Sequence, residues 1–134
     1  MELIMTIHAY ISKQINNVKG NEMSICMIPF TGEAEGSYFN GKVLGEGVDT
    51  QKIYNKDNVQ LSARYMLEGE DLKGNKCNVF IENNGTSLDN CIPKIVTDSP
   101  DLQFLEEANL VANVIPNEHG VDVKIYNNDE TGRI

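Results

Sequence analysis

Basic residues are scarce in this sequence. Lys and Arg together number 11, against 20 Asp and Glu, which gives a formal net charge of −9. Such a chain is repelled by a phosphate backbone, because nucleic-acid binding normally depends on clustered Lys and Arg. An anionic membrane surface repels it too, and no apolar run approaches the roughly 20 residues that a spanning helix needs. We therefore expect a soluble protein that binds neither nucleic acid nor a membrane.

Cysteine and histidine are also few. The three cysteines, Cys26, Cys77 and Cys91, are widely spaced and form no C-x-x-C, which argues against a disulfide framework and a zinc ribbon. The two histidines, His8 and His119, cannot form a His-rich metal cage. The first residues lack the basic start and the small-residue cleavage site of an export signal. These absences predict a cytoplasmic protein without a bound metal.

Common catalytic and nucleotide-binding signatures are missing as well. The sequence contains no G-x-S-x-G motif, Walker loop or dinucleotide fingerprint. Glycines do cluster between positions 41 and 47, but they lie within a strand-like pattern and open no helix. We therefore expect no nucleotide and no other cofactor.

The sequence does contain alternation of apolar and polar residues with a period of two, which is typical of half-buried strands. The first such segment places its apolar residues at Leu3, Met5, Ile7, Ala9 and Ile11. Further segments of this kind, separated by turns rich in Asn and Gly, are 23–30, 37–44, 59–69 and 76–83. The segments "NLVANVIPN" and "GVDVKIYN", on either side of the turn "NEHG", predict a final hairpin.

Residues 86–100 are the least regular part of the chain, and we expect them to cover an opening or an edge as a lid. After them, Ser99 and Pro100 are placed to begin a short helix of two turns. The polar residues 128–134 form a frayed tail.

Seven or eight antiparallel strands without a βαβ rhythm predict that residues 1–127 form a single all-β domain, a barrel or a sandwich, with one short helix before the final hairpin. Closure is favoured because strands of this length otherwise leave exposed edges. Gly41, Gly45 and Gly47 suit a strand that bends sharply around a barrel. Alternatively, their missing side chains let a ligand approach the backbone.

Three blocks of the sequence resemble a bacterial and fungal family known as domain of unknown function 3237. They are "GSYFNGKVLGEGVD", "LSARYMLEGED" and "LKGNKCNVFIENNG", which follow the order and spacing of the family pattern over residues 36–85. The segment "SPDLQFLEEANLVANV" is similar to the closing part of that pattern. The resemblance implies a calycin-like β-barrel of about eight strands but no general activity. It maps the family pattern onto Gly41, Gly47, Asp49, Ala63, Arg64, Tyr65 and Gly85.

Asp49 and Arg64 form the first candidate site, because adjacent strands would bring them close together. An Arg guanidinium binds a carboxylate at two points. Either the two residues pair with each other, or Arg64 holds a substrate carboxylate or enolate. Strand parity, however, places Arg64 opposite the apolar face of its strand, and in that orientation it would lie at an oligomer interface.

Glu82 and Tyr38 are further polar groups that could face a cavity, where burial would raise a carboxyl pKa enough for proton transfer. We therefore consider Asp49 and Glu82 as candidate catalytic residues. The candidate ligand-binding residues are Arg64, Tyr38 and Tyr65.

Two functional hypotheses follow. In the first, the barrel binds a small apolar or aromatic acid and possesses a cofactor-free isomerase or lyase activity. In the second, the protein is a non-catalytic homo-oligomer, most simply a dimer, with Arg64 at the subunit interface.

Overall fold

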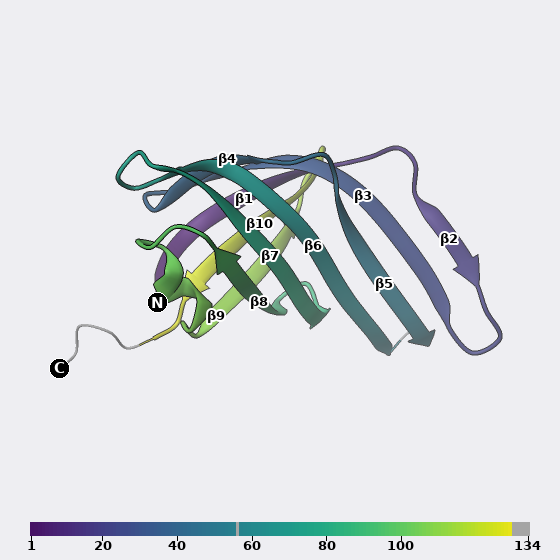
Figure 1. The fold of residues 1–134 in the computed structure, drawn as a ribbon. Helices are drawn as coiled ribbons and strands as arrows, with labels where there is room; N and C mark the ends of the chain where they lie inside the picture. Colours follow the sequence, from purple (N-terminus) through teal and green to yellow (C-terminus); the bar gives the residue numbers. More distant parts are fainter. Residues whose placement is uncertain (56, 130–134) are drawn as a thin grey trace.

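The computed structural model describes residues 1–55 and 57–129. The strands form one antiparallel sheet that closes into a barrel, and buried and exposed side chains alternate along them (Figure 1). The strands are β1 (Glu2–Ile11), β2 (Asn16–Lys19), β3 (Ser24–Glu35), β4 (Phe39–Val43), β5 (Gly47–Asn55), β6 (Asn58–Asp71), β7 (Lys76–Ser87), β8 (Asn90–Thr97), β9 (Leu110–Pro116) and β10 (Gly120–Asn127). A 3-10 helix, η1 (Gln103–Glu106), lies between β8 and β9.

The barrel is an up-and-down meander. Each strand pairs antiparallel with the strand that follows it around the wall, and β10 returns to pair with β1 over eight residue pairs from Glu2 and Asn127 to Tyr10 and Gly120. The short β2 pairs with the first residues of β3, beyond the point where β1 ends. β4 and β5 together fill one position between β3 and β6. The prediction of an all-β barrel of about eight strands is therefore confirmed.

The glycine-rich segment interrupts the strand that β4 and β5 share. Val43 pairs with Leu67 and Val48 pairs with Arg64, so five steps on one strand oppose three on the other. Two extra residues leave the period-two alternation in phase, and Gly45 turns the chain there with a φ of 60°. A Cβ at Gly47 would lie 2.6 Å from the ring of Phe30. The glycines therefore serve bending and side-chain packing.

The alternation predicted for β1 is shifted at one position. A β-bulge between Leu3 and Met5 breaks the register with β10. As a result Ile4 is fully buried and Leu3, which the sequence pattern had assigned to the interior, is 45% exposed. The extra residue of a bulge changes which side chain points inward, and the apolar run "LIM" offers either choice.

The predicted lid is wrong for most of its length, because residues 90–97 form β8, a wall strand with alternating buried and exposed positions. The predicted two-turn helix is the shorter η1, which begins after Leu102 and lacks a side-chain cap. Of the predicted tail, Asn128 still donates its backbone N–H to the carbonyl of Asn109 at 2.8 Å; residues 130–134 lie outside the described residues. Within the described part of the chain, no helix is long and apolar enough to cross a membrane.

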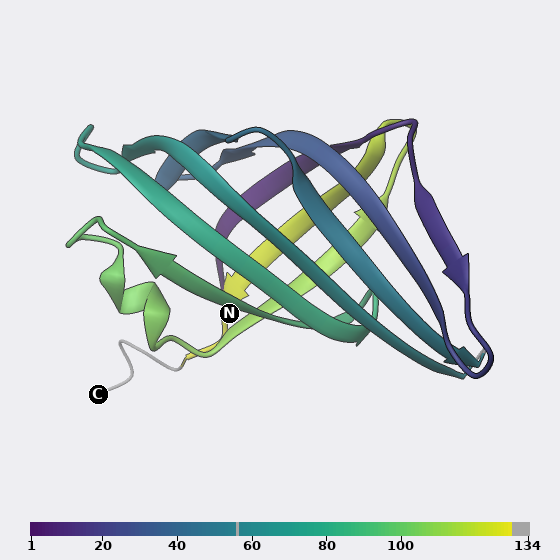
Figure 2. The ribbon, with the colours of Figure 1, turned by 45° about the vertical axis from the view of Figure 1, so that its right-hand side comes forward.

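One end of the barrel is filled. Its core consists of side chains that are 0 to 1% exposed, namely Ile4, Phe39, Leu67, Val79, Leu102, Leu105 and Ile125. Leu102 and Leu105 come from the segment around η1, which lies across this end of the barrel (Figure 2). The segment is held by the Ser99 hydroxyl, which donates to Asp71 at 2.8 Å, and by Glu106, which accepts from the backbone N–H of Thr97 at 3.0 Å.

Candidate cavity in the open half of the barrel

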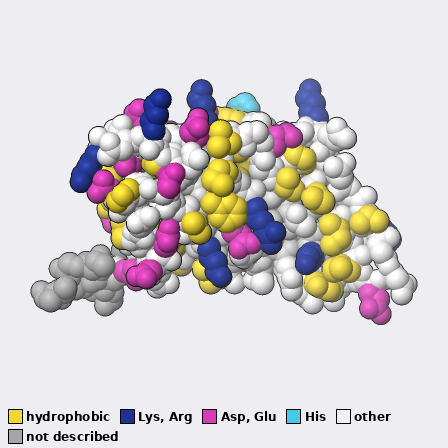
Figure 3. Space-filling model, viewed as in Figure 1, with side chains coloured by type: hydrophobic (Ala, Val, Ile, Leu, Met, Phe, Trp, Pro, Cys, Tyr) yellow, Lys and Arg dark blue, Asp and Glu magenta, His cyan; other side chains and the backbone are white. Residues whose placement is uncertain are grey.

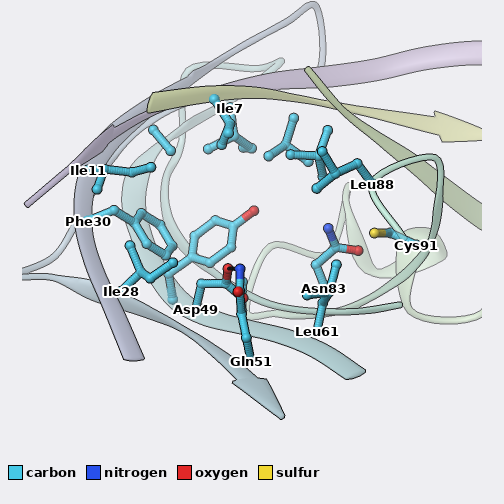
Figure 4. Close-up of a pocket in the computed structure, with 16 residues that line it drawn as sticks. Ile7, Ile11, Ile28, Phe30, Asp49, Gln51, Leu61, Asn83, Leu88 and Cys91 are labelled. Atoms are coloured by element: carbon cyan, nitrogen blue, oxygen red, sulfur yellow. Dashed lines mark hydrogen bonds between the residues drawn. The ribbon is translucent and has the colours of Figure 1, made fainter. Parts of the chain in front are cut away.

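The other half of the barrel is hollow. A cavity of about 140 Å³ lies between the strands there. Most of its wall is apolar and comes from β1, β3, β9 and β10, while the polar groups come from β5, β6 and β7 (Figure 4). The lining residues that the following paragraphs use are Asp49, Gln51, Ala63, Tyr65, Asn83, Leu88 and Cys91.

Strand register places the polar groups around a small residue. Asp49 pairs with Ala63, and Ala63 pairs with Asn83, so the three lie in one row across β5, β6 and β7. Adjacent strands are about 4.8 Å apart, which puts the backbones of Asp49 and Asn83 about 10 Å from each other. Tyr65 follows two residues after Ala63 on the same inward face of β6. The methyl group of Ala63 leaves space between the acid and the amide.

The carboxyl of Asp49 is the one carboxyl among the described residues that line the cavity. Its pKa is raised by burial, since a low-polarity environment disfavours the charged form, and is lowered in part by the Gln51 amide, which donates to Oδ2 at 3.0 Å. Asp49 and Gln51 lie side by side in the view of Figure 4. Asp49 therefore holds a proton at higher pH than an exposed aspartate does.

Two buried polar groups at the cavity lack partners. Tyr65 is 5% exposed and Asn83 is 6% exposed, and neither the Tyr65 hydroxyl nor the Asn83 Oδ1 has a hydrogen-bond partner within the described structure. The ring of Tyr65 packs edge-on against Phe30 at a centroid distance of 5.2 Å, and burial raises the pKa of its hydroxyl, which stays protonated. Buried polar groups are normally satisfied, so these two groups are free to form hydrogen bonds with a molecule in the cavity, water included.

Cys91 and Leu88 line the cavity beside Asn83 (Figure 4). The Cys91 thiol donates to the carbonyl of Ser87 at 3.2 Å. Burial raises the pKa of this thiol, and the nearby charge of Asp49 adds to the rise, so the group is a thiol and not a reactive thiolate. Leu88 lies in the turn between β7 and β8 and is 44% exposed. Leu88 and Cys91 are the residues of the predicted lid that line the cavity.

The structure brings together two of the five candidate residues from the sequence, Asp49 and Tyr65. Arg64 does not pair with Asp49, because it lies on the outer face of β6 with its side chain 67% exposed and donates through Nε to Glu82 Oε2 at 2.7 Å. Glu82 lies on the same outer face, outside the cavity. Tyr38 is also elsewhere: its hydroxyl donates to Glu2 at 2.7 Å and its ring lies 5.7 Å from that of Phe104.

Asn83 and Gln51 are the polar cavity residues that the sequence reading missed. Asn83 begins the "NNG" triplet, a composition typical of the turn that ends a strand, whereas β7 continues to Ser87. The alternation of Cys77, Val79 and Ile81 extends to Asn83, and following it two residues further would have placed this amide inside.

Among the described residues, no three His, Cys, Asp or Glu side chains lie close enough together to hold a metal ion. His8 lies on the wall between β10 and β3, where its ring contacts Asp122 at 2.8 Å and Glu35 at 3.1 Å. The hydrogen bond to Asp122 raises the pKa of His8, burial opposes this, and Glu35 adds to the rise. His8 thus links neighbouring strands and does not face the cavity.

The fold and the cavity define the class: a small, closed up-and-down β-barrel with one filled end and one hollow end. The chain belongs to the family described as "Protein of unknown function (DUF3237)", whose model matches residues 1–90. The resemblance found in the three sequence blocks is therefore confirmed. Membership fixes the fold and leaves the activity open.

Two relatives come from Clostridium acetobutylicum. A UPF0311 protein is 40% identical over 60 residues, which is 44% of this chain and 35% of that protein, so the alignment spans about a third of the relative. The crystal structure of a protein with unknown function is 24% identical, covers 94% of this chain and 96% of that chain, and has a TM-score of 0.77. The latter likeness shows the barrel fold.

A crystal structure of an enzyme from Penicillium herquei has the same fold. It is 13% identical, covers 93% of this chain and 92% of that chain, and has a TM-score of 0.69. At this identity the likeness concerns the fold alone.

Proposed function

We propose that the protein binds a small, uncharged and mostly apolar molecule in the hollow half of the barrel. The observation that carries the proposal is the pair of buried polar groups, Tyr65 and Asn83, which have no hydrogen-bond partner in the described structure and lie in an otherwise apolar cavity. A ligand hydroxyl would satisfy both, because it can donate to the Asn83 Oδ1 and accept from the Tyr65 hydroxyl. A ligand carbonyl, which only accepts, would bind the Tyr65 hydroxyl and the Asn83 Nδ2, with the Asn83 amide turned so that its nitrogen faces the ligand. In either case the apolar body of the ligand would fill the space.

The charge of the wall selects a neutral ligand over the acid that the sequence suggested. Among the described residues that line the cavity, none is Lys, Arg or His. A bound carboxylate would lose its hydration without gaining a cation and would be repelled by Asp49 once that group ionises. The size of the cavity, about 140 Å³, suits a single ring, with any larger part of the ligand extending to the mouth.

Thermal-shift measurements with matched pairs of probes test this proposal. We expect cyclohexanone and 2-indanone to raise the Tm, and cyclohexanecarboxylate and indane-2-carboxylate to leave it unchanged. A ligand at about ten times its Kd adds about 1.4 kcal/mol of stability, which is several degrees in a domain of this size. If the carboxylates alone shift the Tm, the ligand is an acid and the proposal is wrong.

Two variants locate the binding. Ala63→Leu fills the space between Asp49 and Asn83, so we expect the Tm shift from both ketones to disappear while the protein remains folded. Arg64→Ala changes the adjacent position on the outer face and should keep the full shift. If Arg64→Ala loses the Tm shift and Ala63→Leu keeps it, the binding site lies outside the barrel.

A second candidate function is homodimer formation through the outer face of β6, β7 and β8. On this face Met66, Phe80 and Val96 form an apolar row, and the neighbouring row is Arg64, Glu82 and Lys94. Met66 is 41% and Val96 58% exposed. Figure 3 shows apolar side chains gathered on this side of the molecule, next to charges of both signs. Alternating charges beside an apolar row suit the self-complementary contact of a twofold dimer.

Sedimentation measurements test this candidate. We expect the wild-type protein to sediment as a dimer and Val96→Lys to sediment as a monomer. Ile115→Lys, which changes a 45% exposed apolar residue on β9, is the control and should remain a dimer. If the wild-type protein sediments as a monomer at high concentration, the homodimer proposal is wrong. The proposal of ligand binding in the cavity does not depend on this result.

We also propose that the protein resides in the cytoplasm. In the described structure Cys26, Cys77 and Cys91 are free thiols, which fits a reducing compartment. Cells are quenched in acid, and the protein is then denatured and alkylated without a reductant; mass measurement should find all three cysteines modified. A disulfide in the trapped protein would argue for an oxidising compartment.

A further inference from the structure

We propose that the cavity catalyses proton transfer at the carbon next to a ketone carbonyl, with Asp49 as the base and with the Tyr65 hydroxyl and the Asn83 amide as donors to the oxygen. This activity rests on the proposed binding of a neutral ligand in the same cavity. It adds a reaction class and assigns roles to Asp49, Tyr65 and Asn83.

The arrangement of the three groups fits this chemistry. Asp49 and Asn83 lie on opposite sides of Ala63, with Tyr65 two residues further along β6. A ketone lying over the Ala63 methyl group would present its α-carbon to one side and its oxygen to the other. Enolisation requires this separation, because the base takes a proton from carbon while the donors stabilise negative charge on the oxygen.

The protonation states of Asp49 and Tyr65 also suit the proposed proton transfer. Tyr65 remains a donor at neutral pH, because burial raises the pKa of its hydroxyl. The raised pKa of Asp49 brings its basicity closer to that of the carbon it must deprotonate, which makes it a stronger base than an exposed aspartate. The Asn83 amide can turn either its oxygen or its nitrogen toward the ligand, since both ends have the same shape.

The reaction balances without a co-reactant. The Asp49 carboxylate takes the α-proton, the C–H electron pair becomes the C=C bond, and the carbonyl π pair moves to the oxygen. The resulting enolate accepts hydrogen bonds from Tyr65 and Asn83. Asp49 then returns a proton to carbon, either at the original position or, in an unsaturated ketone, at the far end of the conjugated system. No electron is gained or lost overall.

Hydrogen exchange of the probe ketones in D2O measures the proposed step directly. NMR of 2-indanone and cyclohexanone should show deuterium entering the α-positions at least about 100-fold faster with saturating protein than in buffer. Asp49→Asn should reduce the protein-dependent rate about 100-fold or more, and Tyr65→Phe about 100-fold. The wild-type rate should rise with pH as Asp49 loses its proton, and Asp49→Asn should lack this rise.

Glu82→Gln is the matched control, because it makes the same carboxyl-to-amide change on the outer face and should leave the exchange rate unchanged. Saturation-transfer NMR on the same samples measures binding separately. If the ketones bind but exchange no faster than in buffer, the enolisation proposal is wrong and the binding proposal stands. If neither ketone binds, both proposals fail. A loss of exchange in Glu82→Gln equal to that in Asp49→Asn would also overturn the assignment.

Discussion

The filled end and the hollow end of the barrel share strands β6 and β7, yet the two ends differ in which side chains point inward. At the filled end, β4, β6 and β7 contribute Phe39, Leu67 and Val79, and the segment around η1 adds two leucines from outside the wall. At the hollow end, the same sheet carries Asp49, Ala63 and Asn83, and Leu88, from the turn between β7 and β8, is the one described lining residue outside a strand. One end supplies packing for stability, and the other gives up packing for a cavity.

The largest difference between the ends should appear when the same side chain is shortened in each. Ile125 and Ile7 are both fully buried, but Ile7 borders the cavity. We expect Ile125→Ala to lower the free energy of unfolding by about 4 kcal/mol, since it opens a hole in a packed core. Ile7→Ala should lower it by about 2 kcal/mol, because fewer contacts exist on the cavity side. Urea unfolding of both variants gives the comparison, and equal losses would mean that the two ends are equally packed.

Gly47 lies against Phe30 and Tyr65, two residues that line the cavity. An added Cβ would lie 2.6 Å from both the Phe30 ring and the Tyr65 Cβ, so we expect Gly47→Ala to destabilise the protein by about 2 kcal/mol. Gly45→Ala is the control for backbone strain alone, because its φ is 60° and nothing in the described structure lies within 4 Å of the added atom. That variant should lose about 1 kcal/mol. A smaller loss at Gly47 than at Gly45 would show that the rings move aside easily.

Removing a polar group from the hollow end should stabilise the protein. Tyr65→Phe deletes a buried hydroxyl that has no partner in the described structure, and we expect a gain of about 1 kcal/mol in unfolding free energy. Tyr38→Phe is the control, since it deletes an exposed hydroxyl that donates to Glu2, and it should change stability little. A stability loss in Tyr65→Phe would mean that the hydroxyl is already satisfied, for instance by water.

The smallest effect concerns the pH dependence of stability. The pKa of Asp49 is raised in the folded state above its ordinary value of 3.8, so the folded protein binds this proton more tightly than the unfolded chain does. Stability from this group is therefore greatest at low pH and declines as pH rises through the folded pKa. Asp49→Asn removes the decline, so its advantage over the wild type should grow as the pH rises above the ordinary value of 3.8 and level off above the folded pKa. A constant difference across this range would contradict the raised pKa.

The fold was largely predictable because one physical rule controls it. Strands with one buried face alternate with a period of two, and this rule located β1, β3, β4, β6, β7, β9 and β10. It failed where the chain departs locally from that rule. The bulge in β1 exchanged Leu3 for Ile4, and β8 was hidden because Pro93 and the turn residues around it resemble a loop.

The site was only partly predictable, because the sequence of one strand does not show which residues of other strands face it across the barrel. Asp49 and Tyr65 were found from their place in the sequence blocks. Arg64 was assigned by chemistry although its parity pointed outward, and the structure pairs it with Glu82 on the outer face. Asn83 was missed because the Asn-Asn-Gly triplet that it begins is a strong turn signal. Only its pairing with Ala63 places it at the cavity.

The pairing that closes the wall has a topological consequence. Glu2 and Asn127 are partners in one ladder, so the two ends of the described sheet are neighbours. When β4 and β5 are counted as one wall position and the short β2 is set aside, every other pairing joins wall positions that follow one another along the chain. A circularly permuted gene that links these ends and begins instead at a hairpin loop, such as the one containing Gly74, would encode the same wall in the same cyclic order. Closure is thus a property of the ring of strands and does not depend on which strand is synthesised first.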